Sequence, residues 1–214
     1  AICVDKMIHI AKEKYHADWV INVDADEFWW TPLRNLKKAI GNYPHNNIIY
    51  VPLKNMVPEE GLTWIEWSNV VLNSIENYEV EGLSKYSLYR SPIPKVIHRT
   101  QFYQIISRGN HQVQMLFEAS VLSKDIMIYH YPIRGYKHFE NKTIRGGEAY
   151  LHNPNKTQGV HWRFWYSLYQ KGALINEFSR VIGIDKISDF KKRGIIGTDI
   201  RFLKYLRVVC NNSK

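Results

Sequence analysis

The alternation of helical and strand patterns at the start of the chain constrains the fold most. Residues 2–15 place apolar side chains at helical spacing, and residues 19–23 form a short apolar run typical of a strand covered on both faces. Residues 31–41 predict a helix with Thr31 as its N-cap, and residues 48–53 predict another strand. Helices that alternate with apolar strands predict an α/β fold with a parallel or mixed sheet.

The rest of the chain is less regular. Residues 55–83 predict a long excursion without clear periodicity. Further predicted elements are strands at 95–99, 102–107 and 126–131, and helices at 135–150 and from 161 to 172. Short helical pieces and glycines fill the C-terminal part, so we expect a main domain over residues 1–175 and a helical extension over residues 176–214.

Composition limits the class of protein. A chain of 214 residues with 45% hydrophobic side chains can bury a core, and a formal net charge of +9 favours anionic partners. No apolar stretch reaches the roughly 20 residues that cross a bilayer. Because the helical pattern is already under way at Ile2, we expect the true N-terminus to lie upstream. The expected compartment is the cytoplasm or the periphery of a membrane, and the secretory lumen stays open.

An acidic cluster follows the first apolar run. In "WVINVDADEFWW", residues 19–30, Asp24, Asp26 and Glu27 stand directly after the predicted strand. Residues two apart in an extended segment point to the same side, so Asp24 and Asp26 are expected to aim at one point. Two close carboxylates need a neutralising cation or a shared proton. Oxygen ligands suit Mg²⁺ or Mn²⁺, and open α/β sheets bind ligands beyond the carboxyl ends of their strands.

Simpler interpretations stay open for these acids. Asp24 and Asp26 can be solvated loop residues, or one of them can cap the following helix. For Glu27 three roles remain: support of the metal ligands, pairing with a basic residue, or recognition of substrate hydroxyls.

Several segments together resemble a known family. "ADWVINVDADEFWW" resembles the D-x-D segment of family-2-like glycosyltransferases with the GT-A fold. "PKVIHRT" at 94–100, "RGNHQV" at 108–113, "YHYPIRGYKHFENKTIRGGEAY" at 129–150 and "HWRFWYSLYQKGAL" at 161–174 resemble later parts of it, in the same order. The resemblance implies a GT-A-like, Rossmann-like mixed sheet flanked by helices. The strand, helix and strand that begin such enzymes and hold the nucleoside are missing here, so we expect an N-terminally truncated version.

The resemblance also implies a reaction and its binding residues. The reaction is transfer of a sugar from a nucleotide-sugar donor to a hydroxyl of a glycan, a lipid-linked or a protein acceptor, with inversion. Asp24 and Asp26 are expected to bind Mn²⁺ or Mg²⁺, and His130 is expected to complete the metal shell or to serve as a structural hydrogen bonder. Lys95 and Arg134 are expected to contact the diphosphate, or else to be solvated at the surface.

The base and the acceptor contacts are less defined. An inverting transferase needs a base that deprotonates the acceptor hydroxyl, and the candidates are Glu66 and His111. A structural turn role is open for His111. Trp64 is expected to stack on a sugar, although tryptophan is more commonly buried in packing.

Two other classes compete with this interpretation. A metal-dependent phosphoryl-transfer or hydrolytic enzyme would also use close aspartates and a histidine, but the chain has neither a P-loop glycine pattern nor H-E-x-x-H. The positive charge permits a nucleic-acid-binding module, yet no binding motif or basic stripe supports one, so we expect no nucleic-acid partner. A peripheral association with a membrane is compatible with the charge.

Overall fold

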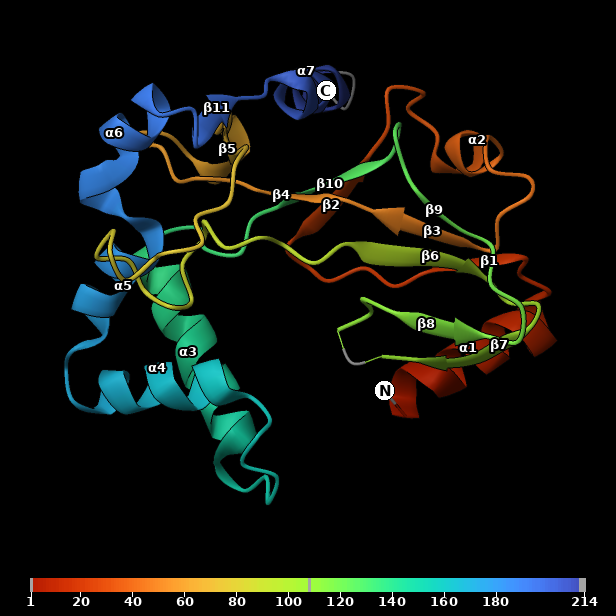
Figure 1. The fold of residues 1–214 in the computed structure, drawn as a ribbon, viewed down its shortest axis with the longest axis horizontal. Helices are drawn as coiled ribbons and strands as arrows, with labels where there is room; N and C mark the ends of the chain where they lie inside the picture. Colours follow the sequence, from red (N-terminus) through yellow and green to blue (C-terminus); the bar gives the residue numbers. More distant parts are fainter. Residues whose placement is uncertain (1, 108, 212–214) are drawn as a thin grey trace. The chain divides into compact units, whose positions relative to one another are not determined.

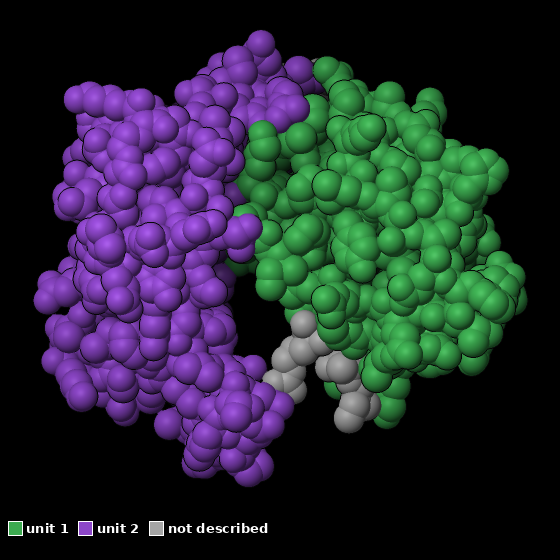
Figure 2. Space-filling model, viewed as in Figure 1, with its two compact units in different colours: residues 1–54, 92–130 green, residues 55–91, 131–214 purple. Residues whose placement is uncertain are grey.

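A computed structural model describes residues 2–107 and 109–211. It is a mixed α/β protein with several small sheets, in agreement with the α/β class predicted from the sequence (Figure 1). The chain forms two compact units, coloured separately in Figure 2. Unit 1 comprises residues 1–54 and 92–130, and unit 2 comprises residues 55–91 and 131–214. Residues 176–214 thus group with 131–175 in unit 2, and the predicted boundary at 175 falls inside a helix.

Unit 1 is built around a four-stranded sheet with the order β1-β6-β3-β9. β1 pairs with β6 and β6 with β3 in antiparallel fashion, whereas β3 and β9 are parallel, so the sheet is mixed. The elements of unit 1 are α1 (Ile2–Tyr15), β1 (Trp19–Ile21), β2 (Glu27–Trp30), α2 (Leu36–Ile40), β3 (Ile48–Val51), β6 (Lys95–Arg99), β7 (Tyr103–Ile106), β8 (Val113–Met115), β9 (Ser120–Leu122) and β10 (Met127–His130). β4 (Leu53–Asn55) stands at the boundary of the two units.

Both faces of this sheet are covered. Alternate residues of a strand point to opposite faces, and in β3 Ile49 joins one apolar cluster while Ile48 joins another. The first cluster includes Ala39 and Ile40 of α2, and the second includes Ile8 of α1. The two-sided burial predicted for residues 19–23 is found only in part: Trp19 and Ile21 pack against the first cluster and Val20 against the second, but β1 is a half-buried edge strand that ends at Ile21. Val23 is exposed.

A second small sheet, in the order β2-β10-β4, carries the segment after the acidic residues. Residues 27–30, for which the sequence predicted no strand, form β2, which pairs antiparallel with β10. The β-branched and aromatic preference of strands accounts for this, since Phe28, Trp29 and Trp30 are all aromatic. The single strand predicted over residues 48–53 is two strands, β3 and β4, because Pro52 between them has no N–H to donate.

The prediction that a helix starts after Thr31 was wrong. α2 begins at Leu36, and its N-cap is Asn35, whose side chain accepts a hydrogen bond from Lys38 N at 3.0 Å. Thr31 instead begins a turn that ends in Arg34, whose φ of 52° is left-handed and incompatible with a helix.

Unit 2 is mainly helical. Its core is rich in aromatic side chains, among them Tyr89, Phe139, Trp165, Phe178 and Phe190. β5 and β11 form its two-stranded antiparallel sheet. The elements of unit 2 are η1 (Trp64–Glu66), β5 (Asn69–Val71), α3 (Tyr136–Leu151), α4 (Val160–Gln170), α5 (Leu174–Ile182), η2 (Ile184–Lys186), α6 (Ile187–Lys192), β11 (Ile196–Thr198) and α7 (Arg201–Asn211). Among the helices that the structure describes, none has the length and apolar character needed to cross a membrane.

Candidate functional site

The acidic residues lie in a tight turn between β1 and β2. Glu27 N donates to Asp24 O at 3.1 Å, which closes the turn, and Asp24 N lies 3.4 Å from the Glu27 carboxylate. The backbone from Asp24 to Asp26 is therefore not the extended segment from which we expected both aspartates to aim at one point. Each aspartate has its own basic partner instead. We call residues 24–27 the acidic turn.

Lys95 holds two of the three carboxylates. Its Nζ lies 2.6 Å from Asp24 Oδ2 and 2.9 Å from Glu27 Oε1. β6 runs antiparallel to β1 with Ile21 opposite Ile97, so Lys95, at the start of β6, comes just past the end of β1. Of the three roles open for Glu27, pairing with a basic residue is the one found.

Lys95 is charged although it is buried. Its side chain is only 4% exposed. Burial by itself lowers the pKa of Lys95, but the hydrogen bonds and negative charges of Asp24 and Glu27 outweigh burial and raise this pKa above its ordinary value. Lys95 is thus an internal counter-ion of the acidic turn, and the surface solvation considered for it does not apply.

His130 faces the remaining carboxylate. β10 pairs with β2 so that His130 stands opposite Glu27, and this register brings its ring to the acidic turn. His130 Nε2 lies 3.8 Å from Asp26 Oδ2. The structure therefore arranges the charged residues in two sets. Asp24 and Glu27 contact Lys95, and Asp26 faces His130.

His111 is fixed by a backbone carbonyl near the start of β6. Its Nδ1 lies 3.0 Å from Pro94 O, and since a carbonyl only accepts, Nδ1 carries the hydrogen and neutral His111 keeps Nε2 as an acceptor. The position before Asn110 requires glycine for two reasons. Gly109 has a φ of 78°, and a Cβ on it would lie 2.9 Å from the His111 ring. Arg108, which begins the "RGNHQV" segment, lies outside the described residues.

The other predicted site residues belong to unit 2. Glu66 accepts hydrogen bonds from Thr63 N at 2.9 Å and Thr63 Oγ1 at 2.7 Å, which makes a capping box around η1. These bonds lower the pKa of the exposed Glu66 carboxyl. Trp64 packs edge-on against Tyr131, with ring centroids 5.3 Å apart.

Arg134 contacts Trp64 and a histidine. Its guanidinium carbon lies 5.2 Å from the centroid of the Trp64 ring, and its Nη2 lies 3.1 Å from His138 Nε2. Its Nε is buried and has no hydrogen-bond partner within residues 2–107 and 109–211.

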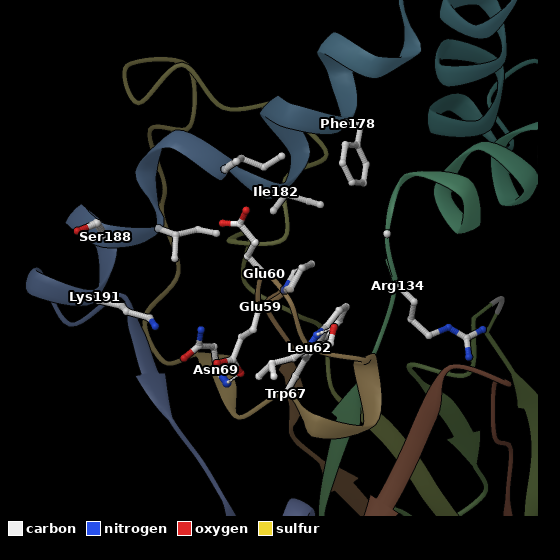
Figure 3. A pocket seen from close by; sticks show the side chains of 14 residues that line it. Glu59, Glu60, Leu62, Trp67, Asn69, Arg134, Phe178, Ile182, Ser188 and Lys191 are labelled. Carbon is white, nitrogen blue, oxygen red and sulfur yellow. Dashed lines mark hydrogen bonds between the residues drawn. The ribbon is translucent and has the colours of Figure 1, made fainter.

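Arg134 also lines a pocket in unit 2, which sequence reasoning missed. The pocket has a volume of about 930 Å³. In Figure 3 the Glu60 side chain extends toward Ile182 at the end of α5, whereas Arg134 points away from the other lining residues. The lining residues are Pro58, Glu59, Glu60, Leu62, Trp67, Asn69, Arg134, Gly135, Phe178, Ile182, Ile184, Ile187, Ser188 and Lys191. They come from separate segments, and no motif in the sequence marks them.

Asn22 is a second residue that the sequence did not single out. It stands two positions before Asp24, and its side-chain Nδ2 is buried without a hydrogen-bond partner among the residues that the structure describes. A buried amide donor without a partner costs free energy, so an acceptor oxygen from a ligand would stabilise it. No sequence signal distinguishes this asparagine from a structural one.

An ion at the acidic turn would need ligands besides the protein's side chains. Among the described residues, no three His, Cys, Asp or Glu side chains converge so as to hold an ion by themselves. Comparison of the chain with protein-family models and with curated proteins finds no match.

Proposed function

We propose that this protein is a metal-dependent glycosyltransferase with a GT-A-like fold, which moves a sugar from a nucleotide-sugar donor to a hydroxyl acceptor. The observation that carries the proposal is the acidic turn at the carboxyl end of β1, with Asp26 beside His130 and Asp24 half-exposed. Open α/β sheets bind ligands at this end of their strands. The ordered resemblance of the later segments to family-2-like glycosyltransferases supports the same reaction.

The residues of the turn fit a divalent cation. Asp24, Asp26 and Glu27 with the Lys95 ammonium carry a formal charge of −2 between them, which one divalent cation would neutralise. Carboxylate oxygens with one imidazole suit Mn²⁺, and Mg²⁺ commonly takes one or two protein carboxylates and completes its shell with water and phosphate oxygens. Asp26 and His130, whose side chains lie 3.8 Å apart, would hold the ion together with oxygens of the donor diphosphate, and Asp24 stays a predicted ligand. When bound, it supplies positive charge that stabilises the departing diphosphate.

The chain's own residues have distinct roles in this proposal. Lys95 fixes Asp24 and Glu27, and the buried Nδ2 of Asn22 offers a donor for a ligand oxygen. The roles predicted for Arg134 at the diphosphate and for Trp64 as a stacking surface for the sugar stay predictions, since both residues belong to unit 2.

The two candidate bases differ in suitability. A general base works best when its pKa lies near the working pH. The hydrogen bonds from Thr63 lower the pKa of Glu66, which makes Glu66 less suitable as this base. The ring of His111 is oriented by Pro94 O and keeps Nε2 as an acceptor for the hydroxyl proton. We therefore favour His111 as the base of an inverting transfer.

Calorimetric titration of the chain with nucleotide sugars, in the presence and absence of Mn²⁺, tests the proposal. We expect heat of binding for at least one donor only when Mn²⁺ is present, and loss of that heat in Asp26→Ala. A matched control is Asp189→Ala, which removes an exposed carboxylate of unit 2 and should leave donor binding unchanged. Donor binding that is unaffected by Asp26→Ala would refute the proposed site.

The same titration separates the competing enzyme class. A phosphoryl-transfer or hydrolytic enzyme should bind simple phosphate esters with Mn²⁺, and should release inorganic phosphate from them. A glycosyltransferase should release the nucleoside diphosphate only when sugar is transferred to an acceptor or to water. Release of inorganic phosphate without sugar transfer would favour the alternative.

A further inference from the structure

We propose that the pocket of unit 2 is a binding site for a neutral saccharide. All of its lining residues belong to unit 2, and its volume of about 930 Å³ lies in the range of roughly 300–1,000 Å³ that small-molecule sites occupy. The inference does not rest on the proposed function, because it involves neither the acidic turn nor a metal. It assigns to this chain a second binding site, which the transfer reaction does not require.

Asn69 is the residue that points to a polar ligand. It is only 3% exposed, and its backbone is held in β5, opposite Thr198 of β11. Its side-chain amide makes no hydrogen bond to residues 2–107 and 109–211, and it lines the pocket. A buried amide without a partner costs free energy. A ligand in the pocket that both donates and accepts a hydrogen bond would therefore stabilise it.

The backbone holds the Glu59 carboxylate next to Asn69. Glu59 Oε1 accepts hydrogen bonds from Asn69 N at 2.9 Å, from Ser68 Oγ at 3.3 Å and from Ser68 N. Glu59 Oε2 accepts none from the part of the chain that the structure describes. The carboxylate is thus oriented in advance, and one of its oxygens is left as an acceptor for a ligand.

Two further charged side chains of the pocket lack an ion-pair partner. Glu60 and Lys191, which is the residue before the last in α6, both line the pocket, and neither forms an ion pair with another described residue. In Figure 3 the Lys191 side chain extends toward Asn69, whereas Glu60 extends toward Ile182. The pocket therefore offers unused donors and unused acceptors together.

This mixture favours a neutral ligand that carries hydroxyls. The carboxylates of Glu59 and Glu60 balance the cations of Lys191 and Arg134, so the formal charges of the lining residues sum to zero. A small cation would satisfy only the acceptors, and a small anion would satisfy only the donors. A hydroxyl group donates and accepts, so neighbouring hydroxyls of a sugar ring satisfy both kinds of group.

Apolar side chains provide the rest of the wall. Trp67 and Phe178 line the pocket although they are only 5% and 8% exposed, and Ile182 at the end of α5 lies with them. A sugar ring has C–H faces between its hydroxyls, and aromatic side chains offer a large apolar surface against which such faces can pack. Apolar walls beside mixed donors and acceptors thus fit a sugar ring better than they fit an ion.

The first test uses the unmodified chain without Mn²⁺ and without a nucleotide sugar. The labelled chain is screened on an array of neutral and charged glycans, and the strongest neutral glycan is then titrated while nuclear magnetic resonance follows the side-chain amide groups. We expect the Asn69 amide signal to shift with the glycan. Phenethylamine and phenylacetate, a cation and an anion with an aromatic ring, should leave this signal in place.

The second test compares variants by calorimetry with the same glycan. Asn69→Ala removes the amide, and Lys191→Met removes an exposed donor. Glu59→Gln keeps an oxygen for the backbone N–H groups and replaces the unused acceptor by a donor. We expect the dissociation constant to rise roughly threefold to tenfold in each variant, as the loss of one hydrogen bond implies. Lys192→Met, at an exposed position of α6 outside the pocket, is the matched control and should leave the constant unchanged.

The outcomes decide this proposal separately from the glycosyltransferase proposal. Failure of every neutral glycan to bind, or an Asn69 signal that responds to phenethylamine or phenylacetate and to no glycan, would overturn the saccharide site. Equal affinity in Lys191→Met, Glu59→Gln and the unmodified chain would do the same, and these two variants decide the matter if Asn69→Ala does not fold. Donor binding that requires Mn²⁺ is measured independently, so either proposal can fail alone.

Discussion

The two units each bury a glutamate, and they stabilise it in different ways. In unit 1 the Glu27 side chain is 2% exposed and is paired with the ammonium of Lys95. In unit 2 the Glu177 side chain is 3% exposed and accepts hydrogen bonds from Ser84 Oγ, from Trp165 Nε1 at 3.3 Å and from Arg180 Nη1 at 3.4 Å. Glu177 therefore combines two neutral donors with a guanidinium, whereas Glu27 pairs with an ammonium at 2.9 Å.

This difference follows from the packing of the two units. Unit 1 is a sheet with aliphatic clusters on its faces, and its charges meet at strand ends, where the apolar clusters stop. Unit 2 packs aromatic rings, whose Trp165 N–H and neighbouring Ser84 hydroxyl supply donors inside the core. The comparison therefore contrasts a charge pair at the strand ends of unit 1 with hydrogen bonds from core side chains in unit 2.

Removal of the central aromatic of unit 2 should have the largest effect. Trp165→Ala deletes a ring that packs against Phe139 and removes a donor to Glu177, and we expect it to lower the free energy of unfolding by about 3–5 kcal/mol. Urea denaturation followed by circular dichroism measures this. Trp165→Phe keeps a ring without the donor and should cost clearly less; equal losses would mean that the hydrogen bond, not the packing, holds unit 2 together.

Unpairing the two glutamates tests the comparison directly. Lys95→Met leaves the buried Glu27 without its counter-charge, and we expect a loss of about 3 kcal/mol in the free energy of unfolding. Ser84→Ala removes one neutral donor from Glu177, and we expect a loss of about 1 kcal/mol. Denaturation of both variants under one set of conditions is the measurement. A Ser84→Ala loss as large as that of Lys95→Met would remove the distinction between the units.

The close approach of two helices in unit 2 can be tested with one methyl group. A Cβ on Gly147 of α3 would lie 2.3 Å from the Tyr166 ring of α4, so the helices would have to separate. We expect Gly147→Ala to cost about 1–3 kcal/mol, even though alanine favours helix formation over glycine. Thermal denaturation measures the effect, and Glu148→Ala, at an exposed position of the same helix, is the control. A stabilised Gly147→Ala variant would show that helix propensity outweighs the contact.

Acid should have the smallest effect, and it should act through buried His98 in unit 1 and partly buried His161 in unit 2. Burial lowers the pKa of His98 in unit 1, and burial together with the charges of Lys142 and Arg90 lowers the pKa of His161 in unit 2. Below the ordinary histidine pKa of about 6.5 the unfolded chain binds protons that the folded chain does not. Stability is therefore full above that pH and falls as the pH drops toward the folded-state pKa, by at most about 1.4 kcal/mol per pH unit and histidine.

Variants without the titrating group check this pH dependence. His98→Phe keeps a ring beside Tyr103 and should flatten the decrease in unfolding free energy between pH 7.5 and pH 5.5, and His161→Phe should do the same. Chemical denaturation at the two pH values gives the difference. An unchanged difference in both variants would assign the acid sensitivity to other groups.

Part of this protein could be predicted from local patterns. The helix at residues 2–15 and the strand at 95–99 agree with α1 and β6, because their periodicity and residue types are consistent over the whole element. The start of α2 could not be predicted, since Thr31 with Pro32 and Asn35 both offer acceptable caps, and the left-handed Arg34 decides between them. The acidic segment was recognised, but its turn geometry was not.

The partners of the charged residues were not predictable from spacing. Lys95 was expected at a diphosphate, and it pairs with Asp24, 71 residues away in the chain. Glu66 and His111 each have local partners, a capping threonine and a backbone carbonyl, which the sequence left open. Contacts of this kind depend on strand register and loop closure, which no short window of sequence contains.

The sequence by itself determined elements such as the helix at residues 2–15 and the strand at 95–99, and that three acids follow the first strand, because these properties depend on side-chain periodicity within a few residues. The tertiary structure decided which charge meets which. The register of β6 on β1 brings Lys95 to Asp24 and Glu27, and the register of β10 on β2 brings His130 to Asp26. Such pairings are set by the burial of whole strand faces, so a shift of one residue would send every one of these side chains to the opposite face.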